Sequence, residues 1–270
     1  MSELPIVVSI EAGVAEVLLN RPDKHNALTP EMLVRLARAW EAIAEDSSVR
    51  VAILSGAGDK TFCAGADLKR LTPLLTRSRK AEDEWDEALL ADPKILNRAM
   101  LRRTDFSVPV VAALRGAVMA GGMEIALACD LRVAADTSVL GLLEVKRGLI
   151  PAAGGIARVS RQIPWAVAAE ILLVGDAISA QEALKFGLVN RVVSAEAVMP
   201  TARELAARMA QNSPFAMRKA KEAMQACSGL TLGDAFGVED ASIKLVLRSE
   251  DAKEGSRAFV EKRAPAFVGR

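Results

Sequence analysis

Residues 109–151, PVVAALRGAVMAGGMEIALACDLRVAADTSVLGLLEVKRGLIP, are the stretch that decides the fold. The first eight residues are rich in valine and alanine and predict a buried strand that ends at Gly116. Gly121 and Gly122 then lead into a helical segment that is apolar on every side except at Glu124. A helix that is apolar all round belongs in the interior. Its first N–H groups and the positive end of its dipole can therefore face an anion or a developing oxyanion.

Two glutamates stand in this apolar stretch. Glu124 lies inside the buried helical segment and Glu144 lies in LGLLEV, 20 residues later, with the strand-like LRVAAD between them. A buried carboxylate costs several kcal/mol or more unless it is paired or protonated, and Arg132 or Arg147 could be such a partner. If the two acids share a pocket, desolvation and repulsion separate their proton affinities, so that one can donate a proton while the other accepts one.

Composition excludes several classes of function. The 270 residues include 35 Lys and Arg against 34 Asp and Glu, which gives no nucleic-acid footprint. His25 is the single histidine, so neither a zinc or iron cluster nor a serine-protease triad is expected. Three scattered cysteines, Cys63, Cys129 and Cys227, indicate reduced thiols. With no apolar run of membrane-spanning length and no signal-like start, we expect a cytoplasmic protein.

The N-terminal third predicts alternating strands and helices. Residues 4–20 are expected to form a hairpin around Ala12 and Gly13, and Thr29 should cap a helix that runs to about Glu45. A buried strand over 49–56 leads through a glycine-rich turn into FCAGADLK, residues 62–69, where strand should give way to helix. Two strand–turn–helix junctions, at 64–69 and 116–124, can supply the two donors of an oxyanion hole.

The rest of the chain is predicted to be mostly helical. Residues 71–103 are charged and contain Pro73, Pro93 and Trp85, which indicates either a wall of a substrate pocket or a solvated helical excursion. Helical spacing recurs at 166–173 and 180–186, with Gly187 as a stop and a short strand at 188–193. Beyond Ser194 we expect helices over 200–210, 214–226, 235–248 and 250–262, packed on the main domain or on a neighbouring subunit.

Taken together, these segments resemble the enoyl-CoA hydratase/isomerase (crotonase) superfamily, and most closely its two-glutamate hydratases. The ordered motifs are RPDKHNAL, FCAGADLK, PVVAALRG, AGGMEIALACD, LEVKRGLIP, GLVNRVV and RAFVEKR. The resemblance implies an α/β fold: a spiral of repeated ββα units over 1–194 and a helical trimerisation region over 195–270. It also implies a homo-trimer or a dimer of trimers, an acyl-CoA substrate of fatty acid metabolism, and no metal or cofactor besides the coenzyme A of the substrate.

The resemblance assigns roles to individual residues. Ala66 and Gly121 match the residues whose backbone N–H groups hold the thioester oxygen. Glu124 matches the base toward the attacking water, and Glu144 matches the group that delivers a proton to C2. The remaining matches are substrate-binding positions: Lys24 and the segment Ala64, Gly65, Ala66, Asp67, Leu68 and Lys69 correspond to loops that contact CoA, and Phe259 and Lys262 correspond to C-terminal residues that can reach a neighbour's nucleotide.

The predicted activity is the reversible syn addition of water across the 2,3-double bond of a 2-enoyl-CoA. Three departures from the family pattern leave alternatives open: Ala120 replaces the first of three glycines, Leu143 replaces a proline, and PAAGGIAR stands where PGxGGTQR is frequent. The first change lies outside the donor itself and is expected to be small. The alternatives are an isomerase, racemase or dehydratase for a specialised acyl-CoA, similar to carnitinyl-CoA dehydratase, and an acyl-CoA-binding relative without turnover.

Overall fold

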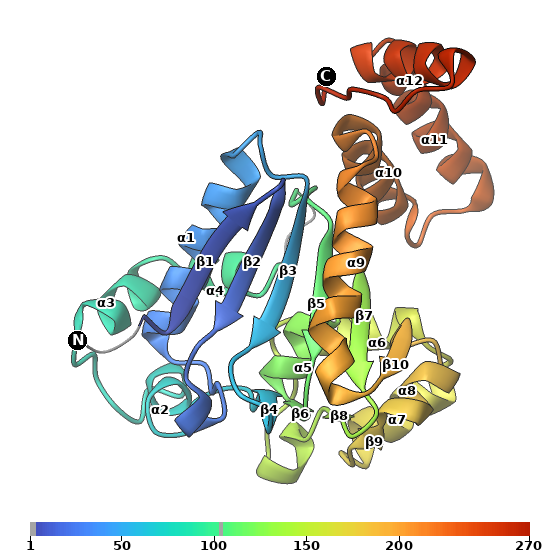
Figure 1. Cartoon of the computed structure of the whole chain (residues 1–270). Coiled ribbons are helices and arrows are strands. Elements are labelled where there is room, and N and C mark those ends of the chain that lie inside the picture. The colour runs from blue at the N-terminus through green and yellow to red at the C-terminus, as the bar shows by residue number, and fades with distance from the viewer. Residues whose placement is uncertain (1–3, 103–104) are drawn as a thin grey trace.

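Two β-sheets with helices around them carry the fold (Figure 1). The computed structural model describes residues 4–102 and 105–270. The larger sheet has six strands in the spatial order β1 (Ile6–Glu11), β2 (Val14–Leu19), β3 (Val51–Gly56), β5 (Val110–Leu114), β7 (Leu131–Ala135) and β10 (Arg191–Val193). β1 and β2 are antiparallel, and every later pair is parallel.

The smaller sheet repeats the same order one step further along the chain. Its strands are β4 (Thr61–Cys63), β6 (Ala117–Met119), β8 (Val139–Gly141) and β9 (Ile178–Ser179). β4, β6 and β8 are parallel, and β9 pairs with β8 in the antiparallel direction. Successive strands thus form pairs in which the first strand joins the larger sheet and the second joins the smaller sheet. The pairs are β3 with β4, β5 with β6, and β7 with β8. Helices follow each of these pairs, so the repetition is the predicted spiral of ββα units.

Helices fill the connections between strands and form the C-terminal part. The α-helices are α1 (Pro30–Glu45), α2 (Leu71–Leu75), α3 (Glu84–Ala91), α4 (Lys94–Ala99), α5 (Gly121–Ala126), α6 (Gly155–Gln162), α7 (Trp165–Leu173), α8 (Ala180–Lys185), α9 (Val198–Ala210), α10 (Pro214–Cys227), α11 (Leu232–Val246) and α12 (Glu250–Glu261). Short 3-10 helices are η1 (Pro22–Lys24), η2 (Glu144–Arg147) and η3 (Ala195–Ala197). Among the described residues, no helix is both long enough and apolar enough to cross a membrane.

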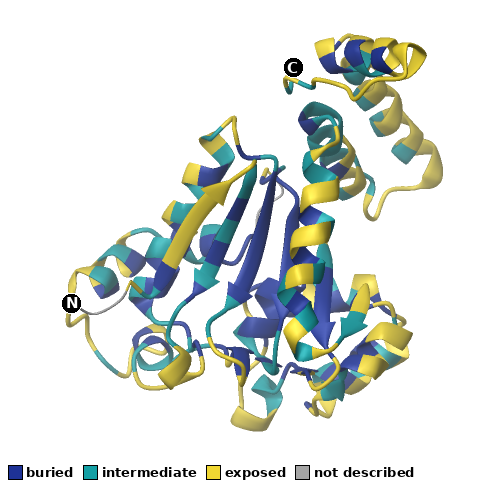
Figure 2. Ribbon diagram, viewed as in Figure 1, coloured by how far each residue is buried: buried dark blue, intermediate teal, exposed yellow. Residues whose placement is uncertain are grey.

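The central strands of the larger sheet, β3, β5 and β7, are buried on both faces, as parallel sheets usually are, whereas the edge strand β1 is mostly exposed. Because successive side chains of a strand point to opposite faces, Ala52 and Leu54 of β3 belong to the main core, whereas Val51 and Ile53 face the other way. That second face is covered by α9, whose small residue Ala202 is buried there. Figure 2 shows the central strands as the most buried part of the molecule.

Several local predictions are confirmed. The N-terminal hairpin turns at Ala12 and Gly13, and the Thr29 side chain accepts a hydrogen bond from the Met32 N–H at the start of α1. Gly187 follows α8 with a φ of 76°, a left-handed conformation that suits glycine. The predicted helices of the second half are present, with ends that differ by a few residues.

Two predicted helices are shorter or later than expected. The apolar segment after Gly121 is helical only to Ala126, because the Arg132 guanidinium donates to the carbonyls of Ala126 and Cys129 and ends the helix before β7. The segment at 62–69 contains no helix, and α2 begins only at Leu71. There the Asp67 carboxylate accepts hydrogen bonds from the N–H groups of two following residues and holds a turn instead.

The C-terminal helices lie apart from the sheets. α10 to α12 project from one end of the molecule in Figure 1, and α11 has no buried residue in the single chain. Large apolar side chains on α11 and α12, including Phe236, Leu245 and Phe259, are exposed. The division into a catalytic core over 1–194 and a trimerisation region over 195–270 stays a prediction, and α9 within the second part packs on the larger sheet.

Candidate active site

A cavity of about 490 Å³ lies against the N-terminus of α5. Its wall is almost entirely aliphatic, and its few polar side chains are Thr72, Thr76, Glu124, Glu144 and Arg147. The other lining residues are Leu28, Leu33, Ala64, Ala66, Leu68, Leu71, Leu75, Leu96, Met100, Met119, Ala120, Gly121, Leu143, Leu149, Ile150, Ala152 and Ala153. Such an apolar cavity with a few convergent polar groups is the usual form of a small-molecule site.

The two strand–turn–helix junctions meet at this cavity. A Cβ built on Gly122 would lie 2.2 Å from the Cys63 carbonyl oxygen, so α5 crosses the end of β4 at a distance that only glycine allows. This close approach brings the two turns together: a Cβ on Gly121 would lie 3.7 Å from the Ala66 nitrogen. Gly122 therefore serves packing, while Gly121 and Ala66 line the cavity.

Glu124 is buried at the cavity, with 4% of its surface exposed. Its Oε1 accepts hydrogen bonds from the N–H groups of Ala153, at 2.7 Å, and Gly155, at 2.9 Å. Burial raises the pKa of this carboxyl above its ordinary value, whereas the two N–H groups and the charge of Arg158 oppose that rise. The carboxylate form is therefore solvated by backbone donors and can act as a base.

Glu144 meets a different environment at the start of η2. Burial and the nearby charge of Glu124 raise its pKa to about 7. Its Oε2 is buried and has no hydrogen-bond partner among the described residues. Because the two carboxyls interact electrostatically and differ in their donors, Glu144 can hold a proton near neutral pH while Glu124 is ionised.

This environment predicts a pH-dependent effect of Glu144→Gln on stability. The folded pKa is above the 4.5 of an unfolded glutamate, so the stability of the wild type falls as the pH rises from about 4.5 and reaches its lower level above about pH 7, where folding buries a charge. We expect the variant to be more stable than the wild type by on the order of 1–2 kcal/mol at about pH 8.5, since the carboxyl is partly solvated, and equally stable at about pH 4. Thermal unfolding across this range measures the difference. A constant difference at every pH would contradict the assigned environment.

The ion pairs considered from sequence do not form around these acids. Arg132 donates to the backbone carbonyls of Leu188, Ala126 and Cys129. Arg147 donates to the Leu143 carbonyl at 3.3 Å, and its charge lowers the pKa of Glu144 without a salt bridge between described residues. The interpretation of Glu124 as half of a structural ion pair with either arginine is therefore wrong.

The predicted CoA-contacting loops lie side by side. The Ala64 N–H donates to the His25 carbonyl, and the Leu28 N–H donates to the Gly65 carbonyl, so the loop that carries Lys24 pairs with the segment 64–69. Lys24 and Lys69 are exposed, and Asp67 is half-buried against Arg21. Ala64 and Leu68 line the cavity itself.

Phe259 and Lys262 are not brought to this cavity within one chain. They lie at the end of α12, and Figure 1 shows α12 at the far end of the molecule from α2 and α5. Both residues are exposed. Their predicted contact with the nucleotide of a neighbouring subunit stays a prediction.

Comparison with known proteins adds a family to this geometry. The family described as enoyl-CoA hydratase/isomerase matches residues 9–270. The chain is 36% identical over 266 residues to the (E)-benzylidenesuccinyl-CoA hydratase of Thauera aromatica, with 98% of this chain and 100% of that protein covered. It belongs to the enoyl-CoA hydratase/isomerase family.

Other members of the enoyl-CoA hydratase/isomerase family are similar over nearly their whole length. The chain is 36% identical over 267 residues to the carnitinyl-CoA dehydratase of Proteus mirabilis (strain HI4320), covering 97% of this chain and 98% of that protein. It matches the crystal structure of an enoyl-CoA hydratase from Bacillus anthracis with a TM-score of 0.88 and 37% identity, covering 98% and 100%. The prediction of a crotonase fold is thus confirmed.

Ala120 stands where the glycine-rich pattern of the enoyl-CoA hydratase/isomerase family has a glycine, and its backbone conformation is strained. Its φ is 50° and its ψ is −124°, a conformation that disfavours any residue with a Cβ. We expected the replacement of glycine by Ala120 to be a small change. For the backbone conformation this expectation was wrong, because Ala120 adopts dihedral angles that favour glycine. The strain lies next to the Gly121 N–H, at the point where the chain enters α5.

Replacing Ala120 with glycine should therefore stabilise the protein. Relief of strain of about 1–3 kcal/mol exceeds the roughly 0.4–1 kcal/mol that glycine adds to the entropy of the unfolded chain. We expect a net gain of about 1 kcal/mol, measured by chemical denaturation. The control is Ala157→Gly in the exposed part of α6, which should destabilise by about 0.5–1 kcal/mol. An equal loss of stability in Ala120→Gly and Ala157→Gly would contradict a strained backbone at Ala120.

Sequence reasoning missed the groups that hold Glu124. The Ala153 and Gly155 N–H donors and Arg158 come from the loop PAAGGIAR and the first turn of α6, about 30 residues after the glutamate. The glycine pair in that loop signalled a helix start, but not which side chain its N–H groups would meet. Cys63 packs as expected: burial raises the pKa of its thiol to about 12, so it is no nucleophile at neutral pH.

Proposed function

We propose that the protein is an enoyl-CoA hydratase that adds water reversibly across the 2,3-double bond of a 2-enoyl-CoA. One observation carries the proposal: two glutamates with raised pKa values and residues of two glycine-containing turns line the same apolar cavity. Family membership supports a CoA thioester as the substrate. The proposed reaction needs no cofactor besides the coenzyme A that is part of the substrate.

The first step that we propose is polarisation of the thioester carbonyl. The N–H groups of Ala66 and Gly121 donate hydrogen bonds to the thioester oxygen and stabilise its developing negative charge, and Gly121 adds the positive end of the α5 dipole. Electron density then leaves C3, which becomes electrophilic. One such donor contributes roughly a hundredfold or more to turnover in other enzymes.

Proton transfers complete the addition. Glu124, as carboxylate, takes a proton from the water whose oxygen bonds to C3. The enolate that results collapses when the Glu144 carboxyl gives its proton to C2 on the same face, which is syn addition. Glu124 has then gained a proton and Glu144 has lost one. Transfer of a proton from Glu124 to Glu144 restores both groups for the next cycle.

Dehydration is the second candidate because it is the same reaction in reverse. The relatives named above include one hydratase and one dehydratase at equal identity, and the same groups serve both directions. An isomerase, a racemase or a non-catalytic acyl-CoA binder are the further alternatives that Leu143 and the PAAGGIAR loop left open.

The test is product analysis with straight-chain 2-enoyl-CoAs of increasing length in water labelled with heavy oxygen. Hydration places the label on C3 of a 3-hydroxyacyl-CoA, and the reverse assay starts from that product. A double bond that moves without uptake of label would establish an isomerase instead. Tight binding of every thioester without any turnover would refute the proposal.

Assembly and location belong to the proposal as well. We propose that the exposed apolar side chains of α11 and α12, such as Phe236 and Leu245, are covered in a homo-trimer or a dimer of trimers. In that assembly Phe259 and Lys262 would join Lys24 and the 64–69 segment at the coenzyme A of a neighbour. A cytoplasmic location remains part of the same prediction.

A further inference from the structure

The cavity wall contributed by α2 is held by a cluster of charged side chains. α2 is five residues long, and a helix that short has little stability of its own. Leu71, Thr72 and Leu75 of this helix line the cavity, and so does Thr76, which follows it. Whatever fixes α2 therefore fixes one side of the space in which an acyl group would lie.

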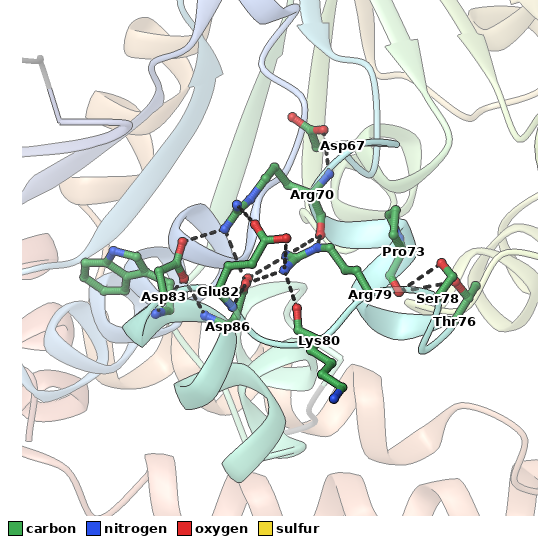
Figure 3. Close-up of polar contacts among 11 residues, drawn as sticks. Asp67, Arg70, Pro73, Thr76, Ser78, Arg79, Lys80, Glu82, Asp83 and Asp86 are labelled. Carbon is green, nitrogen blue, oxygen red and sulfur yellow. Dashed lines mark hydrogen bonds and ion pairs between the residues drawn. The ribbon is translucent and has the colours of Figure 1, made fainter.

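Asp86 is the centre of this cluster (Figure 3). It lies on α3, its side chain has no exposed surface, and both carboxylate oxygens accept from the Arg79 guanidinium. It also accepts from the Glu82 N–H, at 3.0 Å. Arg70 Nη2 makes a longer contact with the same carboxylate, at 3.3 Å, so Arg79 is its main cationic partner. A buried carboxylate with bidentate pairing of this kind has a defined position, because losing the main partner leaves the buried charge poorly compensated.

Arg79 connects Asp86 to the start of α2. Its Nε and Nη2 donate to the Arg70 carbonyl, at 2.9 and 2.6 Å, and Arg70 is the residue that precedes the helix. The Arg70 side chain in turn reaches Glu82 and Asp83, which belong to the approach to α3. The segment from Arg70 to Asp86 is thus closed into a loop through one guanidinium.

The other end of this chain of contacts is anchored on the core. Trp85, next to Asp86 on α3, lies with its ring under the guanidinium of Arg35 of α1, at 4.6 Å from the ring centroid. Asp86 and Leu89 are the buried residues of α3. A rigid path therefore runs from α1 through α3, Asp86 and Arg79 to the carbonyl before α2.

We propose that Arg79 and Asp86 are positioning residues that hold α2 against the acyl chain of the substrate and so set the preferred chain length. This inference rests on the proposed function, because it requires an acyl-CoA in the cavity. The wall that α2 presents to the cavity consists of leucines and threonines, so the group it contacts is an uncharged aliphatic chain. An acetyl group would be too short to depend on that contact.

The experiment compares the dissociation constants of octanoyl-CoA and acetyl-CoA, two saturated thioesters that cannot be hydrated, by calorimetry on the full chain. In Arg79→Met we expect octanoyl-CoA to bind roughly tenfold more weakly, as when about two buried methylene groups lose their contacts, and acetyl-CoA to bind as in the wild type. The control is Arg77→Met, because Arg77 is exposed and forms no salt bridge with a described residue. This variant should leave both constants unchanged.

A second variant guards against an effect of an unpaired buried charge. Arg79→Met combined with Asp86→Asn removes both partners, so the protein keeps no uncompensated carboxylate and should show the same loss for octanoyl-CoA alone. An unchanged ratio of the two constants in both variants, or an equal loss for both thioesters, overturns the proposal. Wild-type protein that binds both thioesters but hydrates no enoyl-CoA refutes the proposed function, while the ratio still tests the role of Arg79.

Discussion

Glu124→Gln and Glu144→Gln should each reduce hydration of a short 2-enoyl-CoA by about 10²–10⁴-fold, the range that one general acid or base supplies. Glutamine keeps the size of the side chain and part of its hydrogen bonding. In the first variant the amide cannot take a proton from water. In the second variant the amide cannot release a proton to C2.

The two positions should differ in how activity depends on pH. The pKa of Glu144 is raised to about 7, so the protonated form that the reaction needs is depleted as the pH rises above that value. In the hydration direction we therefore expect kcat/KM of the wild type to fall on the alkaline side of about pH 7. This alkaline limb should be lost in the residual activity of Glu144→Gln, in which no carboxyl titrates at that position.

Binding separates a chemical effect from a structural one. Both variants should bind a saturated acyl-CoA as the wild type does, because neither carboxyl is assigned a contact with the CoA or the thioester oxygen. Glu182→Gln is the matched control, since this exposed glutamate lies on α8 and only caps that helix. Full turnover in either active-site variant would remove that glutamate from the mechanism.

What the sequence could predict was local. The N-cap at Thr29, the hairpin turn and the buried strand within PVVAALRG, observed over Val110–Leu114, follow from neighbouring residues, and each is confirmed. The meeting of Glu124 and Glu144 at one cavity also follows from the apolar flanks of both residues and from the resemblance. These features depend on spacing and on a few well-understood preferences.

What the sequence could not predict depends on contacts between distant segments. The donors of Glu124 come from residues 153 and 155, and the end of α5 is set by Arg132 of the following strand. The segment 71–103 could be interpreted as a pocket wall or as a solvated excursion, because nothing local shows that Arg79 returns to the Arg70 carbonyl. The charge composition of a segment does not show which charged side chains pair with each other, so these contacts could be identified only in the structure.

Gly122→Ala should destabilise the fold by at least about 3 kcal/mol, because added atoms at a close-packed backbone contact force the backbone apart. The added Cβ would lie 2.2 Å from the Cys63 carbonyl oxygen and 2.8 Å from the Cys63 Cβ. Neither of these atoms is the end of a flexible side chain. Either α5 or β4 must shift; α5 carries Gly121 and Glu124 of the cavity wall, and β4 leads directly into Ala64, which also lines the cavity.

The adjacent glycine is the matched control for this effect. A Cβ on Gly121 meets no atom closer than 3.5 Å, which is ordinary van der Waals contact, so Gly121→Ala should unfold within a few degrees of the wild type. Circular dichroism and thermal melts of the two variants measure the difference. If both variants unfold alike, the distance between α5 and β4 is not what fixes the turn. If only Gly122→Ala unfolds early, the close crossing of helix and strand is what brings the backbones of Gly121 and Ala66 together, and the site depends on a residue that touches no substrate.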